Sequence, residues 1–258
     1  MSVSIRDILY VLEQTAPRSL QEEWDNSGLL VDSNTEYCTG VMLALDVTPS
    51  VVEQAITEGC NLIIAHHPVI FKGLKSVDKS TQQGVAIIKA IKADIAIYCA
   101  HTSLDNAPAP YGVSAVMAEM VGCKVSNVLS PSGTGVIAEC PTPLNTYDLI
   151  DKVKNVFAVD NVRTSIFQPE TVSKIAFGGG ACGFLIPDAI QAGAQAIVTS
   201  DVRYHEFLDY GSQILIIDLT HFDTEKCTKD IFRRIISQKI PKFAQVFCAS
   251  EINPIEYK

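Results

Sequence analysis

The sequence predicts an α/β fold with two α/β domains, each a mostly parallel sheet flanked by helices. Short apolar runs of strand length alternate with segments of helix length, which is the order expected of strand–helix–strand units. The apolar runs are nearly continuous, as in parallel strands that helices cover on both faces. With 258 residues and 47% hydrophobic residues, the chain is long enough for one large α/β domain or for two smaller ones that share an interface.

The predicted elements follow the chain in this alternating order. An amphipathic helix comes first, with apolar side chains at Ile5, Ile8, Leu9 and Leu12 and a stop at Pro17. The predicted strands are 40–48, 61–67, 94–101, 173–179, 194–201 and 213–221, with a last strand in 243–254. The predicted helices between them are 51–59, 81–93, 114–122, 187–193 and 224–238.

The alternation breaks between residues 125 and 172, where Ser, Pro, Gly and Thr interrupt the apolar runs. A strand–helix–strand insertion, or the start of a second domain, fits this stretch. We therefore predict a first domain over 1–124, to which 222–258 returns, and a second domain over 125–221.

The charge and cysteine content narrow the class of protein. The net charge is −9 and no run of Lys or Arg is present, which argues against nucleic acid or an anionic membrane as a partner. We expect a small-molecule substrate, such as a nucleotide. The eight cysteines stand singly, without a C-x-x-C motif, and indicate buried reduced thiols in a cytoplasmic protein. No apolar run is long enough to span a bilayer.

Polar residues end several predicted strands, where ligands of open α/β sheets gather. His66 and His67 end one strand, and the following Pro68 stops the ladder. Adjacent side chains of a regular strand point to opposite faces, but a turn at the strand end would let both rings reach two neighbouring ions. The alternative is one packed and one surface histidine.

Two further pairs add carboxylates to the histidines. His101 and Asp105 lie four residues apart in a stretch expected to be a loop, where Asp105 offers an oxygen ligand. His101 can equally cap that loop. His221 and Glu225 are also four residues apart, and they would share one face of a helix that begins near Thr220 or Asp223. Helix capping explains the intervening Asp223 but leaves His221 unexplained.

Together these residues predict a dinuclear metal centre in a hydrolase. Its ligands would be His66, His67, Asp105, His221 and Glu225. Mixed nitrogen and oxygen ligands suit two ions of Zn, Fe, Mn, Co or Ni better than Mg or Ca. Two such cations activate a water molecule, and His101 and His205 are the candidates for proton transfer. A structural role for His205 is the alternative.

The order of motifs resembles the NGG-interacting-factor-three-like family, whose members are often labelled GTP cyclohydrolase I type 2 homologues. The motifs are 22–32, 44–48, 63–77, 100–107, 177–185, 199–211 and the spacing H-x-x-x-E at 221–225. The resemblance implies the same five ligands, two α/β domains, and a ring-shaped homohexamer whose metal sites line an interior cavity. We place the metal site at the strand ends, in the interdomain cleft. The resemblance also implies purine ring opening at C8 with release of formate. It is weakest across 125–172, where longer members carry an inserted domain.

Other functions stay open at the level of sequence. Gly178, Gly180 and Gly183 have the G-x-G-x-x-G spacing of a dinucleotide-binding loop, and Asp201 ends the next strand. The same glycines can serve a tight turn or a close approach to the metal cavity. The metal centre also fits a phosphoesterase, or a non-enzymatic adaptor or metal-storage assembly.

Overall fold

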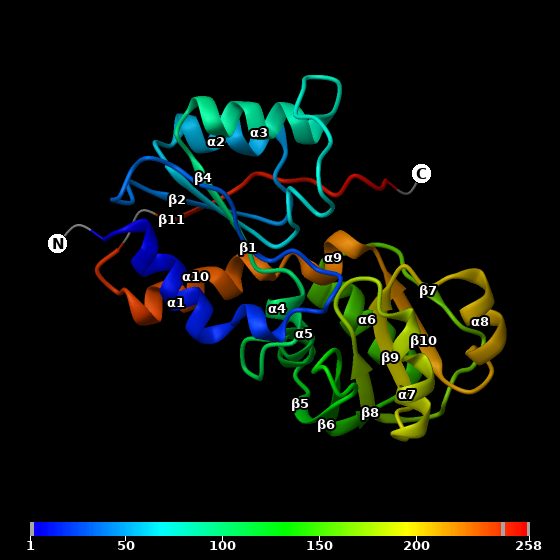
Figure 1. Ribbon diagram of the computed structural model, residues 1–258. Coiled ribbons are helices and arrows are strands. Elements are labelled where there is room, and N and C mark those ends of the chain that lie inside the picture. The colour runs from blue at the N-terminus through cyan, green and yellow to red at the C-terminus, as the bar shows by residue number, and fades with distance from the viewer. Residues whose placement is uncertain (1–2, 244–245, 257–258) are drawn as a thin grey trace. The chain divides into compact units, whose positions relative to one another are not determined.

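The computed structural model describes residues 3–243 and 246–256, and its chain divides into two compact units (Figure 1). Unit 1 holds the residues up to Leu104 together with Thr228–Ile252, and unit 2 holds Asp105–Cys227 with the residues from 253 onward. Each unit has one sheet flanked by helices, so the predicted α/β class is confirmed.

The sheet of unit 1 has the strand order β1-β4-β3-β2-β11, and all neighbours except β1 and β4 are parallel. Its strands are β1 (Gly28–Val31), β2 (Val41–Ala44), β3 (Leu62–Ala65), β4 (Ala96–Cys99) and β11 (Val246–Cys248). Helices α2 (Pro49–Thr57) and α3 (Gln82–Lys92) lie side by side over one face (Figure 1). Helices α1 (Ile5–Thr15) and α10 (Thr228–Lys239) pack together on the other.

Burial explains why these strands could be predicted. Every residue of β2, β3 and β4 is buried, as expected for parallel strands covered on both faces. The edge strand β1 was not predicted. It has four residues, as β2, β3 and β4 do, but only its end residues are buried. Residues 244–245 of the predicted last strand lie outside the described residues.

The sheet of unit 2 is mixed, with the order β5-β6-β8-β9-β10-β7. Its strands are β5 (Lys124–Val128), β6 (Val136–Leu144), β7 (Arg163–Thr164), β8 (Val172–Phe177), β9 (Ala196–Ser200) and β10 (Leu215–Leu219). Strands β8, β9 and β10 are parallel, and the others pair antiparallel. The antiparallel strands thus come from the stretch in which the strand–helix alternation broke.

The helices of unit 2 are short except for α6. They are α5 (Val113–Val121), α6 (Thr146–Phe157), α7 (Ile186–Gln191), α8 (Tyr204–Tyr210) and α9 (His221–Glu225). Helix α5 contacts β5, β6 and β8, which explains why the unit begins at Asp105 and not at the domain boundary drawn after residue 124. None of the helices in the described residues is long and apolar enough to cross a membrane.

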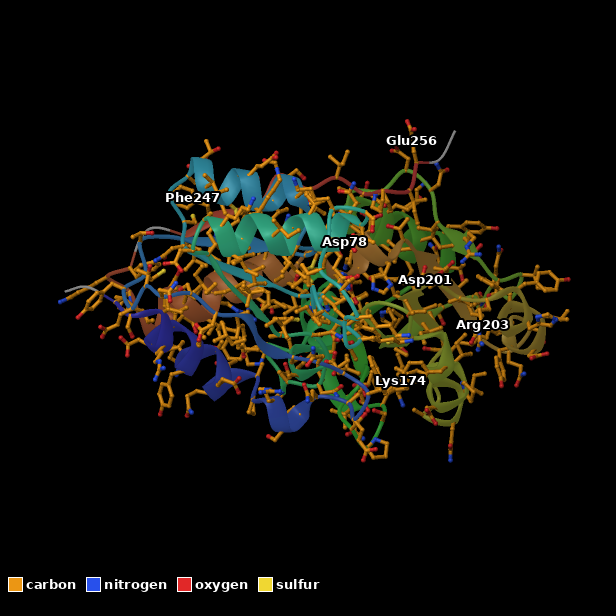
Figure 2. All side chains as sticks on the ribbon, turned by 45° about the horizontal axis from the view of Figure 1, so that its top comes forward. Asp78, Lys174, Asp201, Arg203, Phe247 and Glu256 are labelled. Carbon is orange, nitrogen blue, oxygen red and sulfur yellow. A yellow bond between two sulfur atoms is a disulfide. The ribbon has the colours of Figure 1, made fainter. Side chains whose placement is uncertain are left out.

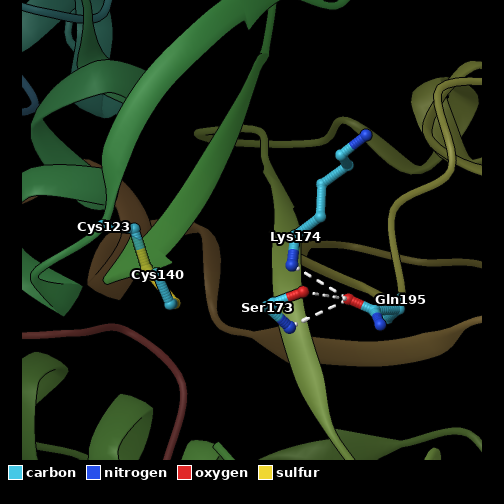
Figure 3. The surroundings of a disulfide bond; sticks show 5 residues. All are labelled: Cys123, Cys140, Ser173, Lys174 and Gln195. Carbon is cyan, nitrogen blue, oxygen red and sulfur yellow. Dashed lines mark hydrogen bonds between the residues drawn. A yellow bond between two sulfur atoms is a disulfide. The ribbon is translucent and has the colours of Figure 1, made fainter. Parts of the chain in front are cut away.

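Two local expectations were wrong. Residues 102–105 form the one-turn helix α4 (Thr102–Asp105) and not a loop, because the prolines begin only at Pro108, after the turn. Cys123 and Cys140 form a disulfide and are not reduced thiols (Figure 3). Lys124 pairs with Glu139 across β5 and β6, which brings the preceding Cys123 opposite Cys140. The sequence alone does not reveal that register.

Candidate metal centre

Three histidine side chains of unit 1 lie together at one edge of its sheet. His66 and His67 follow β3, and His101 follows the neighbouring parallel strand β4. One ring nitrogen from each histidine lies within 4.8 Å of the others, which is close enough for all three to hold one metal ion. The ring centroids of His66 and His67 are 5.1 Å apart, so both rings turn to the same side after the strand ends.

Each of these rings is fixed by an oxygen acceptor at Nδ1. The acceptors are the Ala100 carbonyl for His66 at 3.0 Å, Asp46 for His67 at 2.9 Å, and Asp25 for His101 at 2.7 Å. A carbonyl or carboxylate at Nδ1 requires the proton on that nitrogen, so in the neutral ring Nε2 carries the lone pair. This tautomer is the one that metal-ligating histidines use, with the outer oxygen fixing the ring.

Asp25 holds His101 most firmly. Its buried carboxylate also accepts hydrogen bonds from the backbone N–H and the hydroxyl of Thr102, at 3.0 and 2.6 Å. Burial on its own would raise the pKa of Asp25, but the hydrogen bonds from His101 and Thr102 outweigh it and hold that pKa well below its usual value. Asp25 therefore stays ionised and keeps the His101 proton on Nδ1.

Unit 2 contributes an imidazole and a carboxylate from the one-turn helix α9. Thr220 caps this helix by accepting a hydrogen bond from the Asp223 N–H. His221 and Glu225 then lie on one face, with Nε2 and Oε2 separated by 3.0 Å. His221 Nδ1 is 2.7 Å from Asp201 Oδ2, so this ring is fixed in the same way as those of unit 1. Figure 2 shows Asp201 and Arg203 near each other in the segment before α8.

The glycine-rich loop packs against this carboxylate. Gly180 has φ +69°, and a Cβ at this residue would lie only 2.2 Å from Glu225 Oε1. The Gly180 N–H donates to Thr224 Oγ1 at 3.0 Å, and the Gly179 N–H donates to Ser114 Oγ at 3.2 Å. Both amides already donate hydrogen bonds within the protein, and the Glu225 carboxylate beside Gly180 would repel a phosphate. The loop therefore supports α9, and the structure does not support the hypothesis that this loop binds a dinucleotide.

Asp105 and Glu225 act on the same buried group of unit 2. Burial and then the negative charges of Asp105 and Glu225 raise the pKa of the Cys182 thiol well above its usual value. One carboxylate oxygen of Asp105 lies within 4.8 Å of one of Glu225, although these residues come from α4 and α9, far apart in the sequence. The structure thus brings the two predicted carboxylate ligands into one neighbourhood of unit 2.

Known proteins resemble this chain over its whole length. The sequence profile of the Duf34/NIF3 (NGG1p interacting factor 3) family matches residues 3–254. The chain belongs to this family. A relative from Clostridium acetobutylicum, named GTP cyclohydrolase 1 type 2 homolog, is 32% identical over 233 residues, which cover 87% of this chain and 86% of the relative. A protein of the same name from Lactococcus lactis is 29% identical and covers 93% of both chains.

Solved structures agree with this Duf34/NIF3 assignment. A hypothetical protein of Staphylococcus aureus matches with a TM-score of 0.91 and 29% identity, covering 100% of both chains. A Bacillus cereus protein related to NIF3 matches with a TM-score of 0.92 over 100% of both chains, and its 23% identity supports the fold alone. The resemblance predicted from the motifs is therefore confirmed.

His205 is placed differently from the other histidines of this Duf34/NIF3 protein. It is exposed in the first turn of α8, with its ring 5.4 Å from that of Tyr204. It lines a shallow cavity of about 320 Å³ together with Arg203 and Asp209. Among the described residues, His205 belongs to none of the groups that can hold a metal.

The carboxylates that orient the rings are the functional residues that the sequence did not assign. Asp46 and Asp201 were visible as polar strand ends, and Asp25 lay inside a family motif, but none had a predicted partner. Three histidines each have one aspartate at Nδ1: Asp46 for His67, Asp25 for His101 and Asp201 for His221. The signal in the sequence was that each of these histidines ends a predicted strand and that one such aspartate is present for each.

The residues fit a bound divalent cation. Imidazole Nε2 atoms and carboxylate oxygens form the mixed donor set that Zn, Fe, Mn, Co and Ni accept. The absence of a side chain at Gly180 leaves space for the Glu225 carboxylate beside His221. Residues of both units of this family member thus belong to groups that could hold a metal.

Proposed function

We propose that this protein is a hydrolase that uses two divalent cations, held by His66, His67, Asp105, His221 and Glu225. The observation that carries the proposal is the fixed Nδ1 contact of all three ligand histidines, which presents Nε2 as the metal-binding nitrogen. The cations would be Zn, Fe, Mn, Co or Ni. The names of the relatives support a reaction of the GTP cyclohydrolase type, in which a purine ring opens at C8 and formate is released.

When bound, the two cations would lower the pKa of a water molecule and polarise the bond that is attacked. The protein would supply the proton transfer. With Nδ1 protonated, His101 Nε2 accepts a proton, and the ionised Asp25 stabilises the resulting imidazolium. His205, exposed on α8, is the second candidate for proton exchange with the substrate or solvent.

The test is to measure the metal content per chain in wild type and Glu225→Ala, and then to assay both with GTP, other nucleotides and phosphoesters. We expect about two ions per chain in metal-replete wild type and a loss of metal and activity in the variant. Glu170→Ala, at an exposed acidic residue of the same unit, is the matched control and should behave as wild type.

The outcomes separate the alternatives. Turnover of phosphoesters without GTP ring opening would make the protein a phosphoesterase. Bound metal without turnover of any substrate would indicate a metal-binding adaptor or storage protein. A stoichiometry well below two in metal-replete wild type contradicts the dinuclear centre, and activity that survives metal removal contradicts the mechanism.

The family resemblance also leads us to propose that the chain assembles into a homohexamer. Light scattering on the purified full chain measures the mass of the assembly directly. A monomeric mass at assay concentration would contradict this part of the proposal without affecting the metal ligands.

A further inference from the structure

Two exposed aromatic side chains stand beside the imidazoles of unit 1. Trp24 is 60% exposed and Phe71 is 40% exposed, and their ring centroids are 5.8 Å apart. Both rings also contact His101, at centroid distances of 5.9 and 6.0 Å and in edge-on geometry. We call Trp24 and Phe71 the aromatic platform. Large aromatic surface exposed beside a candidate reaction site is typical of a surface that a ligand covers.

Hydrogen bonds fix the two segments that carry the platform. Asp25, next to Trp24, binds His101 at 2.7 Å. The Asn26 side-chain amide donates to the Ile70 carbonyl, which joins the segment of Trp24 to that of Phe71. The platform is therefore largely organised before a ligand arrives, and binding costs little conformational entropy.

The segment that begins at Phe71 is locally basic. Residues 71–79 are all exposed and include Lys72, Lys75 and Lys79 with a single acid, Asp78. This contrasts with the net charge of −9 for the whole chain. A local excess of positive charge attracts an anionic group of a ligand. The ligand that fits both features has a planar ring and an anionic group.

We infer that the aromatic platform binds the planar heteroaromatic ring of the substrate, with the lysine-rich segment 71–79 attracting its phosphate. This inference rests on the proposed function and deepens it, because it assigns the substrate to the nucleotides by the chemistry of unit 1 alone. Ring stacking on Trp24 or Phe71 tolerates different bases, since every base offers a π face. The two aromatic residues position the substrate and take no part in proton transfer.

The test uses Trp24, the only tryptophan of the chain, as its own reporter. Tryptophan fluorescence of the metal-stripped full chain is titrated with GMP and AMP, and with ribose 5-phosphate and inorganic phosphate as probes without a ring. We expect saturable quenching by both nucleotides and no comparable change with the ringless probes. Equal binding of ribose 5-phosphate and GMP would overturn the inference.

Variants separate stacking from a general loss of structure. Phe71→Ala retains the reporter, and calorimetry serves for Trp24→Ala. Each should weaken nucleotide binding by about tenfold or more, and Trp24→Phe should restore most of it. Tyr204→Ala, at a residue of unit 2 that is 73% exposed, is the matched control and should bind as wild type. Nucleotide binding as in wild type for Trp24→Ala and Phe71→Ala would overturn the inference.

The two proposals fail in different ways. Nucleotide-dependent quenching in a protein that holds no metal and hydrolyses nothing would reject the proposed function and keep the platform. Normal metal content and hydrolysis, with KM unchanged in Phe71→Ala, would reject the platform and keep the function. A change in assembly mass for Trp24→Ala, with nucleotide binding intact, would show that another copy of the chain covers these rings and would also overturn the inference.

Discussion

The metal-binding groups of the two units are built differently. In unit 1, three imidazoles follow the ends of two neighbouring parallel strands, and His66 is completely buried. In unit 2, one imidazole and one carboxylate come from a single helical turn, and Glu225 depends on the loop beneath it. The strand ends are fixed by the sheet, whereas the short helix needs its cap and the glycine loop. Unit 2 should therefore be the more sensitive of the two to small backbone changes.

The two units nevertheless orient one ligand histidine in the same way. In each unit, an exposed aspartate contacts Nδ1 of a partly buried ligand histidine. The pairs are Asp46 with His67 in unit 1 and Asp201 with His221 in unit 2. The distance from Nδ1 to the aspartate oxygen is similar in the two pairs, 2.9 Å for His67 and 2.7 Å for His221. The comparison thus predicts that backbone changes reduce metal binding much more in unit 2 than in unit 1. It also predicts that loss of an orienting carboxylate reduces metal affinity by a similar factor in both units.

Gly180→Ala should give the largest effect. The added Cβ would lie 2.2 Å from Glu225 Oε1, so the carboxylate must move, and φ +69° is unfavourable for alanine. We expect at least one metal ion per chain to be lost, as measured by elemental analysis after dialysis against metal-free buffer.

Gly193→Ala is the control for this change. Gly193 has a similar φ of +75°, but its added Cβ would meet only Lys174 Nζ, at 3.9 Å. This variant should lose a similar amount of folding free energy from the unfavourable φ but should keep its metal. Equal metal loss in both variants would mean that general destabilisation, and not displacement of Glu225, is responsible.

Asp46→Ala and Asp201→Ala should give smaller and similar effects. Each removes the acceptor that fixes a ligand imidazole, and loss of such a partner typically lowers metal affinity by about 10- to 100-fold. Competition with a chelator of known affinity measures both. Asp160→Ala, at an exposed acid of unit 2, should leave affinity unchanged. A tenfold or larger difference between the two variants would break the equivalence of the units.

The strand ends could be predicted because they follow from local patterns, and a local pattern also narrowed the start of the helix that carries His221 to Thr220 or Asp223. A buried parallel strand is a continuous apolar run, and Thr-x-x-Asp is a capping sequence. The positions of His66, His67 and His221 at element ends follow directly from these patterns. The family could also be predicted, since its motifs occur in order along the chain.

Residues that depend on tertiary register could not be predicted. Asp25 and His101 are joined across 76 positions of sequence, and the Cys123–Cys140 bond depends on how β5 pairs with β6. The role of Gly180 required knowing which side chain lies above it. In each case the contact partner comes from a distant segment of the chain. Secondary-structure propensity and hydrophobic periodicity are local, so they do not reveal which residue that partner is.

The smallest expected effect concerns the segment of unit 2 that carries His205. Glu206 is buried and accepts hydrogen bonds from the Arg203 backbone and side chain, which caps α8. Burial would raise the pKa of Glu206, but the hydrogen bonds and charge of Arg203 outweigh it, so the pKa lies below its usual value. Such a carboxylate stabilises the fold above that value, and the contribution disappears as the pH falls through the lowered pKa.

Glu206→Gln should therefore lower the free energy of unfolding by about 1 kcal/mol at neutral pH. The difference from wild type should shrink at acidic pH, as the pH falls through the lowered pKa of Glu206 and this carboxylate becomes protonated. Urea unfolding followed by circular dichroism at a series of pH values measures it, with Glu170→Gln as the exposed control. A penalty that is independent of pH would show that the shape of the cap matters and its charge does not. Because Glu206 touches no predicted ligand, metal content should stay at the wild-type level, in contrast to Gly180→Ala.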